Sequence, residues 1–295
     1  MNVLVVGKDG QLGSAFERHF LRAKPSSKIK WVFVGKEVCD VTDSKAIRTQ
    51  VEKYDPNVIV NCSAYTKVDE CESAEGERMS MKVNVLGNIN LANICLEKNI
   101  AFITFSTDYV YGNTNLSCPL MEGDAILSHP LNVYGEHKLK MEEMVSEILK
   151  ERNYLIFRVS WLWSLESKTS FVSKILDKLS KTEGTVEVVC DQIGTPTCCD
   201  DLVKFVVHVI EKQKYKGHSG IYNYSNEGLC SWYDFAMAIK EVFCNHSEVG
   251  IEPTRSFLCL EKAVRPMYSV MDKTKVKQTF GITIPWWKDS LSKSR

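Results

Sequence analysis

Apolar runs alternate with amphipathic segments through the first half of the chain. Five short runs are apolar almost throughout and predict buried strands, at residues 2–6, 30–34, 57–62, 101–106 and 154–160. The segments between them have helical spacing, at residues 11–21, 43–54, 77–98 and 133–152, and Asp43 or Ser44 caps the second. Apolar strands separated by helices are typical of a parallel sheet covered on both faces. The pattern therefore predicts an α/β fold with a doubly wound, Rossmann-like parallel sheet, whose ligands bind beyond the carboxyl ends of the strands.

The second half of the chain is less regular. Short strands at residues 186–190 and 220–225 alternate with helices near 200–212 and 231–243. Residues 273–291 predict a small helix, a turn and a closing helix. Because no repeat or long linker separates the halves, we expect two closely packed domains. Residues 1–160 form a dinucleotide-binding domain, and residues 161–295 form a smaller mixed α/β domain, mainly for substrate, with segments that return to the first.

Composition narrows the class of protein. An apolar content of 44% and a charged content of 25% are ordinary for a soluble globular chain of 295 residues. Lys plus Arg (37) balances Asp plus Glu (37), so no net charge favours nucleic acid or an anionic membrane as a partner. No run approaches the ~20 apolar residues of a membrane span, and the first residues predict a buried strand in place of a signal peptide. Eleven cysteines without a C-x-x-C pair indicate free thiols in a reducing cytoplasm.

Three glycines separate the first predicted strand from the first predicted helix. Gly7, Gly10 and Gly13 form G-x-x-G-x-x-G, which permits a tight turn and lets the backbone approach a pyrophosphate at a helix N-terminus. At the first strand-to-helix junction of an alternating α/β pattern, this motif predicts a dinucleotide site.

The residues after the second strand bear on which dinucleotide binds. A carboxylate there suits the ribose hydroxyls of NADH, and a cation suits the additional phosphate of NADPH. Lys36 comes first and Glu37 second, which favours NADPH while leaving NADH open. Asp40 and Val41 follow at the position expected for the adenine.

A phenol and an ammonium lie four residues apart in the segment "NVYGEHKLK". On a helix, Tyr134 and Lys138 share one face. A nearby ammonium lowers the pKa of a tyrosine from about 10, which would give an acid able to exchange a proton near neutral pH. His137, between Glu136 and Lys138, is expected to be a solvated neighbour. Thr107, at the carboxyl end of the fourth strand, completes a hydroxyl–Tyr–Lys set.

These segments resemble the extended short-chain dehydrogenase/reductases over nearly the whole chain, and within them the dTDP-4-dehydrorhamnose reductase family. The resemblance is carried by "GKDGQLG", "NCSAYTKVDECE", "STDYVYG", "NVYGEHKL", "FRVSWLW", "DQIGTPT", "YSNEGLCSWYDFA" and "RPMYS". The family implies NADPH-dependent reduction of a nucleotide-linked 4-dehydro-6-deoxy sugar. Tyr134 would give a proton to the C4 oxygen of the sugar, Lys138 would bind the nicotinamide ribose and hold down the tyrosine pKa, and Thr107 would orient the carbonyl.

The resemblance also implies the binding residues. Those at the cofactor are Gly7, Gly10, Gln11, Leu12, Gly13, Lys36, Asp40, Val41, Ser63, Ala64, Tyr134 and Lys138. Those near the sugar are Thr66, Val68, Asp108, Tyr109 and Trp161, although Trp161 is also a candidate for ordinary core packing. Gln192 and Arg265 are candidates for the nucleotide or diphosphate end, where the planar fork of an arginine suits phosphate, although Arg265 is equally a candidate for a structural salt bridge.

Several alternatives differ from this interpretation. The Asp-Glu pair of the nucleotide-sugar 4,6-dehydratases is Asp108-Tyr109 here, and the acid/base cysteine of the bifunctional epimerase-reductases has no counterpart. The magnesium ligand that some reductases carry in the first helix is replaced by Ser14-Ala15, so no metal site is predicted. The non-catalytic regulatory subunit of methionine adenosyltransferase, which resembles the same reductases, and reductases of UDP- or GDP-linked sugars stay open. A homodimer also stays open, because a helix face buried in the core and one buried in a dimer interface have the same hydrophobic periodicity.

Overall fold

A six-stranded parallel sheet forms the centre of the computed structural model, which describes residues 1–22, 28–112, 119–126, 129–181, 184–259 and 262–295. Its strand order is β2-β1-β3-β4-β5-β10, and every neighbouring pair is parallel. The strands are β1 (Asn2–Val6), β2 (Lys30–Val34), β3 (Val58–Asn61), β4 (Ala101–Thr107), β5 (Tyr154–Val159) and β10 (Gly220–Tyr224). The five strands predicted in the first half are confirmed, and a strand from the second half adds the sixth.

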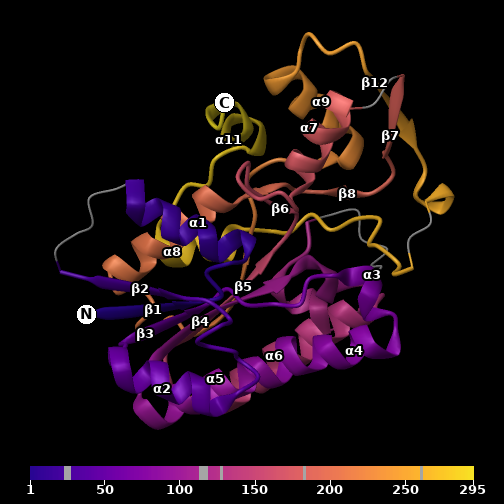
Figure 1. Ribbon diagram of the computed structural model, residues 1–295. Helices are drawn as coiled ribbons and strands as arrows, with labels where there is room; N and C mark the ends of the chain where they lie inside the picture. The colour runs from indigo at the N-terminus through magenta and orange to yellow at the C-terminus, as the bar shows by residue number, and fades with distance from the viewer. Residues whose placement is uncertain (23–27, 113–118, 127–128, 182–183, 260–261) are drawn as a thin grey trace.

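Helices cover both faces of this sheet, as Figure 1 shows. On one face lie α1 (Gln11–Arg22), α8 (Cys199–Glu211) and α10 (Thr274–Phe280). On the other lie α2 (Ser44–Tyr54), α5 (Gly87–Lys98) and α6 (Val133–Ile148). Asp43 caps α2 by accepting a hydrogen bond from Lys45 N, as predicted. The predicted doubly wound α/β fold is confirmed.

Successive residues of each strand supply the two cores in turn. In β1, Val3 and Val5 face α1 and α8, whereas Leu4 and Val6 face α2 and α5. All four are fully buried. Each such side chain contributes about 1.5–3 kcal/mol when it is fully buried, so strands that are apolar at most positions favour a sheet covered on both faces.

The helix predicted at residues 77–98 is longer and less regular than its periodicity indicated. It begins at α4 (Ala74–Ser80), where Ser73 accepts a hydrogen bond from Gly76 N, passes through a π-helical stretch (Met81–Leu86) and continues as α5. A π-helical turn takes one extra residue and often occurs at functional sites.

The smaller part of the molecule lies above the carboxyl ends of the sheet strands (Figure 1). It contains α7 (Phe171–Lys181), α9 (Trp232–Phe243) and α11 (Trp287–Lys293). Its short strand pairs are β7 (Thr185–Val189) with β12 (Gly250–Thr254), β8 (Ile193–Gly194) with β11 (Cys230–Ser231), and β6 (Leu162–Trp163) with β9 (Thr197–Cys198). These elements share a third core, so the predicted mixed α/β part is confirmed.

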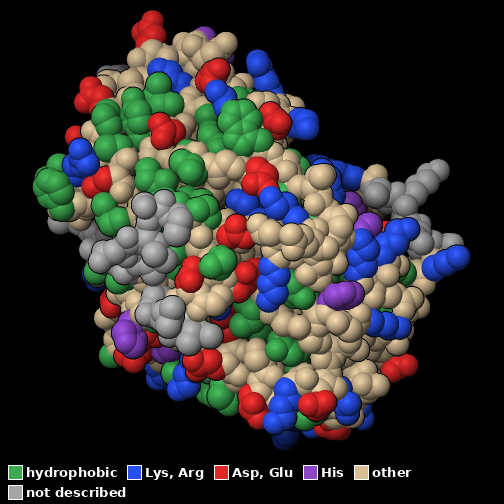
Figure 2. Space-filling view, turned by 180° about the vertical axis from the view of Figure 1, so that it is seen from behind, with side chains coloured by type: hydrophobic (Ala, Val, Ile, Leu, Met, Phe, Trp, Pro, Cys, Tyr) green, Lys and Arg blue, Asp and Glu red, His purple; other side chains and the backbone are tan. Residues whose placement is uncertain are grey.

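The surface of the two parts differs. Seen from behind, apolar side chains gather on the smaller, upper part, whereas charged side chains of both signs are spread over the lower part (Figure 2). Among the helices that the structure describes, none combines the length and the apolar character needed to cross a bilayer. No two of the ten cysteines within the described residues form a disulfide, and Cys118 lies outside them.

Candidate functional site

The glycine turn between β1 and α1 packs against the end of β3. Gly7 has a φ of 83°, in the region that favours glycine, and its N–H donates to Val34 O at 2.9 Å. A Cβ at Gly7 would lie 2.6 Å from Ser63 N, and a Cβ at Gly13 would collide with the backbone of Gly7. Bare backbone therefore lines the N-terminus of α1 at the point where the strand order reverses around β1, which fits a pyrophosphate.

The other residues predicted at this turn contribute in different ways. The side chain of Leu12 belongs to the core, so only its backbone can contact a cofactor. Gln11 is partly exposed at the start of α1. Ser63, directly after β3, donates to Asn61 Oδ1 from its N–H (3.0 Å) and from its hydroxyl, and Ala64 beside it is exposed.

The end of β2 carries charges of both signs. Lys36 is 77% exposed, with its Nζ 3.9 Å from Asp40 Oδ2. Partial burial of Asp40 favours its neutral form, but hydrogen bonds from the N–H and hydroxyl of Thr42 outweigh this and keep its pKa below the ordinary value. A Cβ at Gly35 would collide with carboxylate oxygens of both Asp9 and Glu37.

The carboxylates of Asp9 and Glu37 therefore both lie beside Gly35. Asp9 was not among the residues predicted from the sequence. The end of β2 offers acceptors for ribose hydroxyls as well as the ammonium of Lys36 for a phosphate. Val41, predicted near the adenine, is buried, with its Cγ2 against Gly87.

Thr107, Tyr134 and Lys138 come together, as predicted, where β4 ends and α6 begins. Asn132 caps α6 by accepting a hydrogen bond from Gly135 N at 2.9 Å, which places Tyr134 in the first turn. The hydroxyl of Thr107 lies near that of Tyr134 and donates to Asp108 Oδ1 at 3.1 Å. Lys138 Nζ donates to Phe105 O at 2.6 Å, and all three side chains are buried.

The protonation of this group differs from the sequence-based expectation. Burial raises the pKa of Tyr134, and the nearby charge of Asp108 raises it further, so the predicted lowered pKa is wrong for this structure. Burial lowers the pKa of Lys138 to about 8, while the charge of Glu142 acts in the opposite direction. The reason is desolvation, which disfavours the phenolate and the ammonium alike and cannot be read from a four-residue spacing.

The two residues after Thr107 lie beside the phenol. Asp108 begins a short 3₁₀ helix, η2 (Asp108–Tyr111), and its burial raises its pKa to about 6, although hydrogen bonds from Ser269 and Thr107 favour the carboxylate. The ring of Tyr109 meets the ring of Tyr134 edge-on, with centroids 5.9 Å apart. Both side chains therefore lie beside the phenol of Tyr134.

A buried amide network fixes the segment after β3, and sequence reasoning missed it. Asn88 Oδ1 accepts hydrogen bonds from Asn61 Nδ2 (2.9 Å) and Thr104 Oγ1 (2.8 Å). Asn84, in the π-helical stretch, pairs with both backbone groups of Tyr65 at 2.9 Å. The network holds residues 61–65, and with them Ser63 and Ala64, against the long helix.

His137 corrects another expectation. It was predicted to be a solvated neighbour of Lys138, but it is buried, with Nδ1 2.9 Å from Ser80 Oγ. Burial lowers its pKa, so the ring is a neutral hydrogen-bonding group between α6 and α4.

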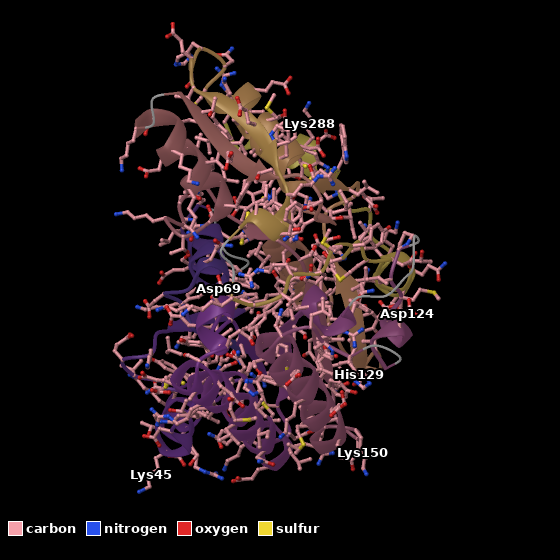
Figure 3. All side chains as sticks on the ribbon, turned by 90° about the vertical axis from the view of Figure 1, so that its right-hand side faces the viewer. Lys45, Asp69, Asp124, His129, Lys150 and Lys288 are labelled. Atoms are coloured by element: carbon pink, nitrogen blue, oxygen red, sulfur yellow. The ribbon has the colours of Figure 1, made fainter. Side chains whose placement is uncertain are left out.

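Arg265 forms the salt bridge that was one of its two predicted roles. Its Nη2 lies 3.0 Å from Asp69 Oδ2, and Asp69 also accepts from the backbone of Lys262 and Ala263. Asp69 belongs to α3 (Val68–Cys71) and lies at mid-height, between Lys45 and Lys150 below and Lys288 above (Figure 3). The pair thus joins the segment of Thr66 and Val68 to the C-terminal part of the chain, and Thr66 itself is exposed.

Trp161 and Gln192 come from the smaller part. Trp161 has a φ of 45° and stacks on Trp232, with centroids 3.5 Å apart and an interplanar angle of 8°. Gly194, at the end of β8, leaves room for its indole, because a Cβ there would lie 2.6 Å from Trp161 Cε2. Gln192 is buried just before the same strand.

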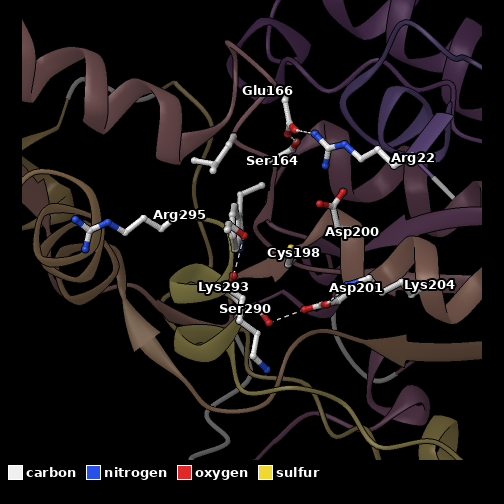
Figure 4. Close-up of a pocket in the computed structure, with 13 residues that line it drawn as sticks. Arg22, Ser164, Glu166, Cys198, Asp200, Asp201, Lys204, Ser290, Lys293 and Arg295 are labelled. Carbon is white, nitrogen blue, oxygen red and sulfur yellow. Dashed lines mark hydrogen bonds and ion pairs between the residues drawn. The ribbon is translucent and has the colours of Figure 1, made fainter. Parts of the chain in front are cut away.

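A cleft of about 340 Å³ lies elsewhere, between α1, α8 and α11. Figure 4 shows Arg22, Lys204 and Lys293 around it together with Glu166 and Asp201. It contains none of the candidate cofactor or substrate residues. Within the described part of the chain, no group of three or more His, Cys, Asp or Glu side chains is arranged to hold a metal ion.

Comparison with known proteins agrees with this geometry. The family model described as the RmlD substrate binding domain matches residues 1–294. A dTDP-4-dehydrorhamnose reductase of Aggregatibacter actinomycetemcomitans is 32% identical over 99% of this chain and 98% of its own length. The structure of a dTDP-4-dehydrorhamnose reductase from Clostridium acetobutylicum has a TM-score of 0.88 at 31% identity and covers 100% of this chain and 98% of its own.

A third relative was solved with a cofactor. The dTDP-4-dehydrorhamnose reductase of Bacillus anthracis in complex with NADP has a TM-score of 0.86 at 28% identity and covers 99% of this chain and 97% of its own. The family match spans residues 1–294, which include the sheet, the glycine turn and the Thr-Tyr-Lys group. The chain belongs to the RmlD substrate binding domain family, that of the dTDP-4-dehydrorhamnose reductases.

Proposed function

We propose that this protein is an NADPH-dependent reductase of the C4 keto group of a nucleotide-linked 4-dehydro-6-deoxy sugar. The substrate that we propose is dTDP-4-dehydrorhamnose, and the product is dTDP-L-rhamnose. The observation that carries the proposal is the buried hydroxyl pair of Thr107 and Tyr134 beside Lys138, at the carboxyl end of β4. The names of the relatives, and the NADP bound by the Bacillus anthracis enzyme, support the same substrate and cofactor.

The residues of the chain fit the proposed cofactor. The bare backbone at Gly7 and Gly13 leaves room for a pyrophosphate at the N-terminus of α1, and Lys36 can donate to a ribose phosphate. Bound NADPH supplies a hydride. Because burial raises the pKa of Tyr134, its phenol carries a proton at neutral pH and is ready to donate it to a carbonyl oxygen.

Lys138 and Thr107 complete the proposed acid. With a pKa of about 8, the Lys138 ammonium is mostly charged at pH 7, so it stabilises the phenolate that forms after proton donation. The Thr107 hydroxyl, which lies near the phenol, orients the same carbonyl oxygen. A positioned acid of this kind contributes about 10²–10⁴-fold in rate.

The two parts of the chain divide the work in this proposal. Residues 1–160 bind the dinucleotide, and residues 161–295 mainly bind the sugar nucleotide. Thr66, Val68, Asp108, Tyr109 and Trp161 surround the sugar, while Gln192 and Arg265 lie toward the nucleotide. The high cysteine content, with no disulfide between described cysteines, supports a reducing cytoplasm as the compartment of the reaction.

The test follows the loss of NADPH absorbance after addition of dTDP-4-dehydrorhamnose, with NADH and with the UDP- and GDP-linked sugars in parallel. The Tyr134→Phe variant removes the proposed proton donor and should lower kcat by about 10²–10⁴-fold. Tyr54→Phe, at the end of α2, is the matched control and should leave kcat unchanged. Cofactor binding without turnover of any sugar would contradict the proposal and favour a non-catalytic, dinucleotide-binding regulatory subunit.

A further inference from the structure

A line of buried polar residues continues along α6 beyond the proposed catalytic pair. Tyr134, Lys138 and Glu142 follow one another at four-residue intervals, so they lie on one face of the helix. Their exposures are 8%, 2% and 1%. A carboxylate buried to this extent needs a charged partner, because desolvation strongly disfavours an isolated ion.

The partner of Glu142 is Arg158 of β5. Arg158 Nη2 donates to Glu142 Oε2 at 2.7 Å, and its Nε donates to Oε1 and Oε2 at 3.0 and 3.2 Å. Both side chains are at least 97% buried, at 3% and 1% exposure. This two-pronged geometry leaves the carboxylate little freedom to rotate.

The remaining donors of Arg158 extend the contact to other elements. Its Nη1 donates to Tyr111 Oη at 3.0 Å and to Glu122 O at 2.8 Å, and Tyr111 Oη donates to Asn223 Oδ1 of β10 at 2.6 Å. Tyr111 ends the short helix η2 that begins with Asp108. The pair therefore links the helix of Tyr134 and Lys138 to the strand end that carries Thr107.

We propose that Glu142 is a positioning residue for the proposed reduction: held by Arg158, its carboxylate keeps the buried Lys138 ammonium charged and α6 fixed against β5. The inference rests on the proposed function, because it concerns the lysine assigned to the cofactor. Burial alone lowers the pKa of Lys138, and Glu142 supplies the charge that opposes this effect. The other titratable residues along this line are Tyr111 and Glu122, which both accept hydrogen bonds from Arg158 Nη1, and Asp108, whose charge acts on Tyr134.

The direction of the expected change follows from these charges. Lys138 loses its charge as the pH rises through its pKa of about 8. Removing the carboxylate moves this pKa to lower values, so the ammonium is lost at a lower pH. If the pKa falls by about one unit, the charged fraction at pH 8 falls about fivefold, and NADPH affinity at pH 8 falls with it.

The test compares Glu142→Gln, the double variant Glu142→Gln with Arg158→Met, and Glu143→Gln as the control. Glu143 is the exposed neighbour on the same helix. The readouts are the NADPH dissociation constant from pH 6 to 9 by calorimetry, kcat over the same range, and urea unfolding. The single variant leaves Arg158 buried without its partner and should be less stable, whereas the double variant removes both charges and should regain stability.

We expect both Glu142 variants to lose NADPH affinity at lower pH than the parent and the Glu143→Gln control. A double variant with both parental stability and the parental pH profile would show that the pair is structural only and would overturn the inference. So would an unchanged profile in Glu142→Gln. Because binding is measured apart from turnover, a parent that binds NADPH without reducing the sugar would refute the proposed function alone, and a parent that does not bind NADPH would refute both.

Discussion

At the scale of single residues, Asp108 differs from the other carboxylates of the site because its partners are hydroxyls and not cations. Burial raises its pKa to about 6, against hydrogen bonds from Ser269 and Thr107 that favour the charged form. By contrast, Asp69 is paired with Arg265, and its pKa is lowered. As the pH rises, the contribution of Asp108 to the stability of the fold should therefore fall, whereas that of Asp69 should rise.

The pH dependence of stability tests the state of Asp108. Between pH 4 and pH 6 the folded protein keeps this carboxyl protonated while the unfolded chain ionises it, so its contribution to stability falls as the pH rises through that window. A shift of about two units corresponds to about 3 kcal/mol. Asp108→Asn removes this loss. The difference in free energy of unfolding, variant minus parent, should therefore be about 3 kcal/mol more positive at pH 7 than at pH 4. Urea unfolding at both pH values measures it.

The control for this prediction is Asp289→Asn, an exposed carboxylate in the first turn of α11. That variant should follow the parent at both pH values. If Asp108→Asn also ran parallel to the parent, Asp108 would titrate as an ordinary carboxyl, and the account of its burial would be wrong.

The residues with chemistry in their side chains could be predicted from the sequence, but their environment could not. Tyr134, Lys138 and Thr107 could be identified from their residue types and their spacing in the sequence, and in the structure they lie close together. The raised pKa of Tyr134 depends on how much chain covers the phenol, which spacing does not encode. Asn88 has no signal of its own, because an asparagine in a helix is usually solvated until tertiary contacts bury it.

At the scale of elements, the pairing of β8 with β11 places Gly194 under the indole of Trp161. Trp161 also stacks on Trp232, the first residue of α9, so its ring is held between two elements. An added methyl group in such packing costs about 1–3 kcal/mol if the ring cannot move, or displaces the ring. The position of the ring therefore depends on a glycine that no motif in the chain singles out.

Gly194→Ala tests whether this tryptophan lines the sugar site. If the displaced ring loses about 1–3 kcal/mol of contact with the nucleotide sugar, KM should rise roughly 5- to 150-fold, while NADPH affinity stays unchanged. A change in tryptophan fluorescence would report the movement of the stacked rings. Gly123→Ala is the matched control, since a Cβ at Gly123 meets no atom within 4 Å. An unchanged KM together with a displaced ring would remove Trp161 from the substrate site.

Elements were predicted most accurately where the chain is uniformly apolar. The strands of the first half lie within two residues of their predicted ends, because a strand covered on both faces is apolar at most of its positions. The π-helical stretch at Met81–Leu86 was not predicted, since one extra residue per turn only shifts the apolar pattern slightly. Asn84 in this stretch pairs with the backbone of Tyr65, and Asn88 in the following α5 accepts hydrogen bonds from Asn61 of β3 and Thr104 of β4, which helix periodicity cannot show.

At the scale of the whole molecule, the two halves are joined by contacts between residues far apart in sequence. β10 completes the sheet beside β5, and α8 packs in the core that holds α1. The hydrogen-bonded pair of Asp69 and Arg265, 196 residues apart, connects α3 to the C-terminal part of the chain. Periodicity predicts each element but not such pairs, which is why the return of the second half to the sheet could be predicted only in outline.

The most direct test of the central claim is the fate of the hydride. The protein would be incubated with dTDP-4-dehydrorhamnose and NADPH deuterated at C4 of the nicotinamide, and the sugar nucleotide analysed by mass spectrometry and NMR. The account predicts a product one mass unit heavier than the unlabelled product, with deuterium at C4 of the sugar, formed by the parent and at least 100-fold more slowly by Tyr134→Phe. A sugar that stays unreduced while NADPH binds would contradict the account.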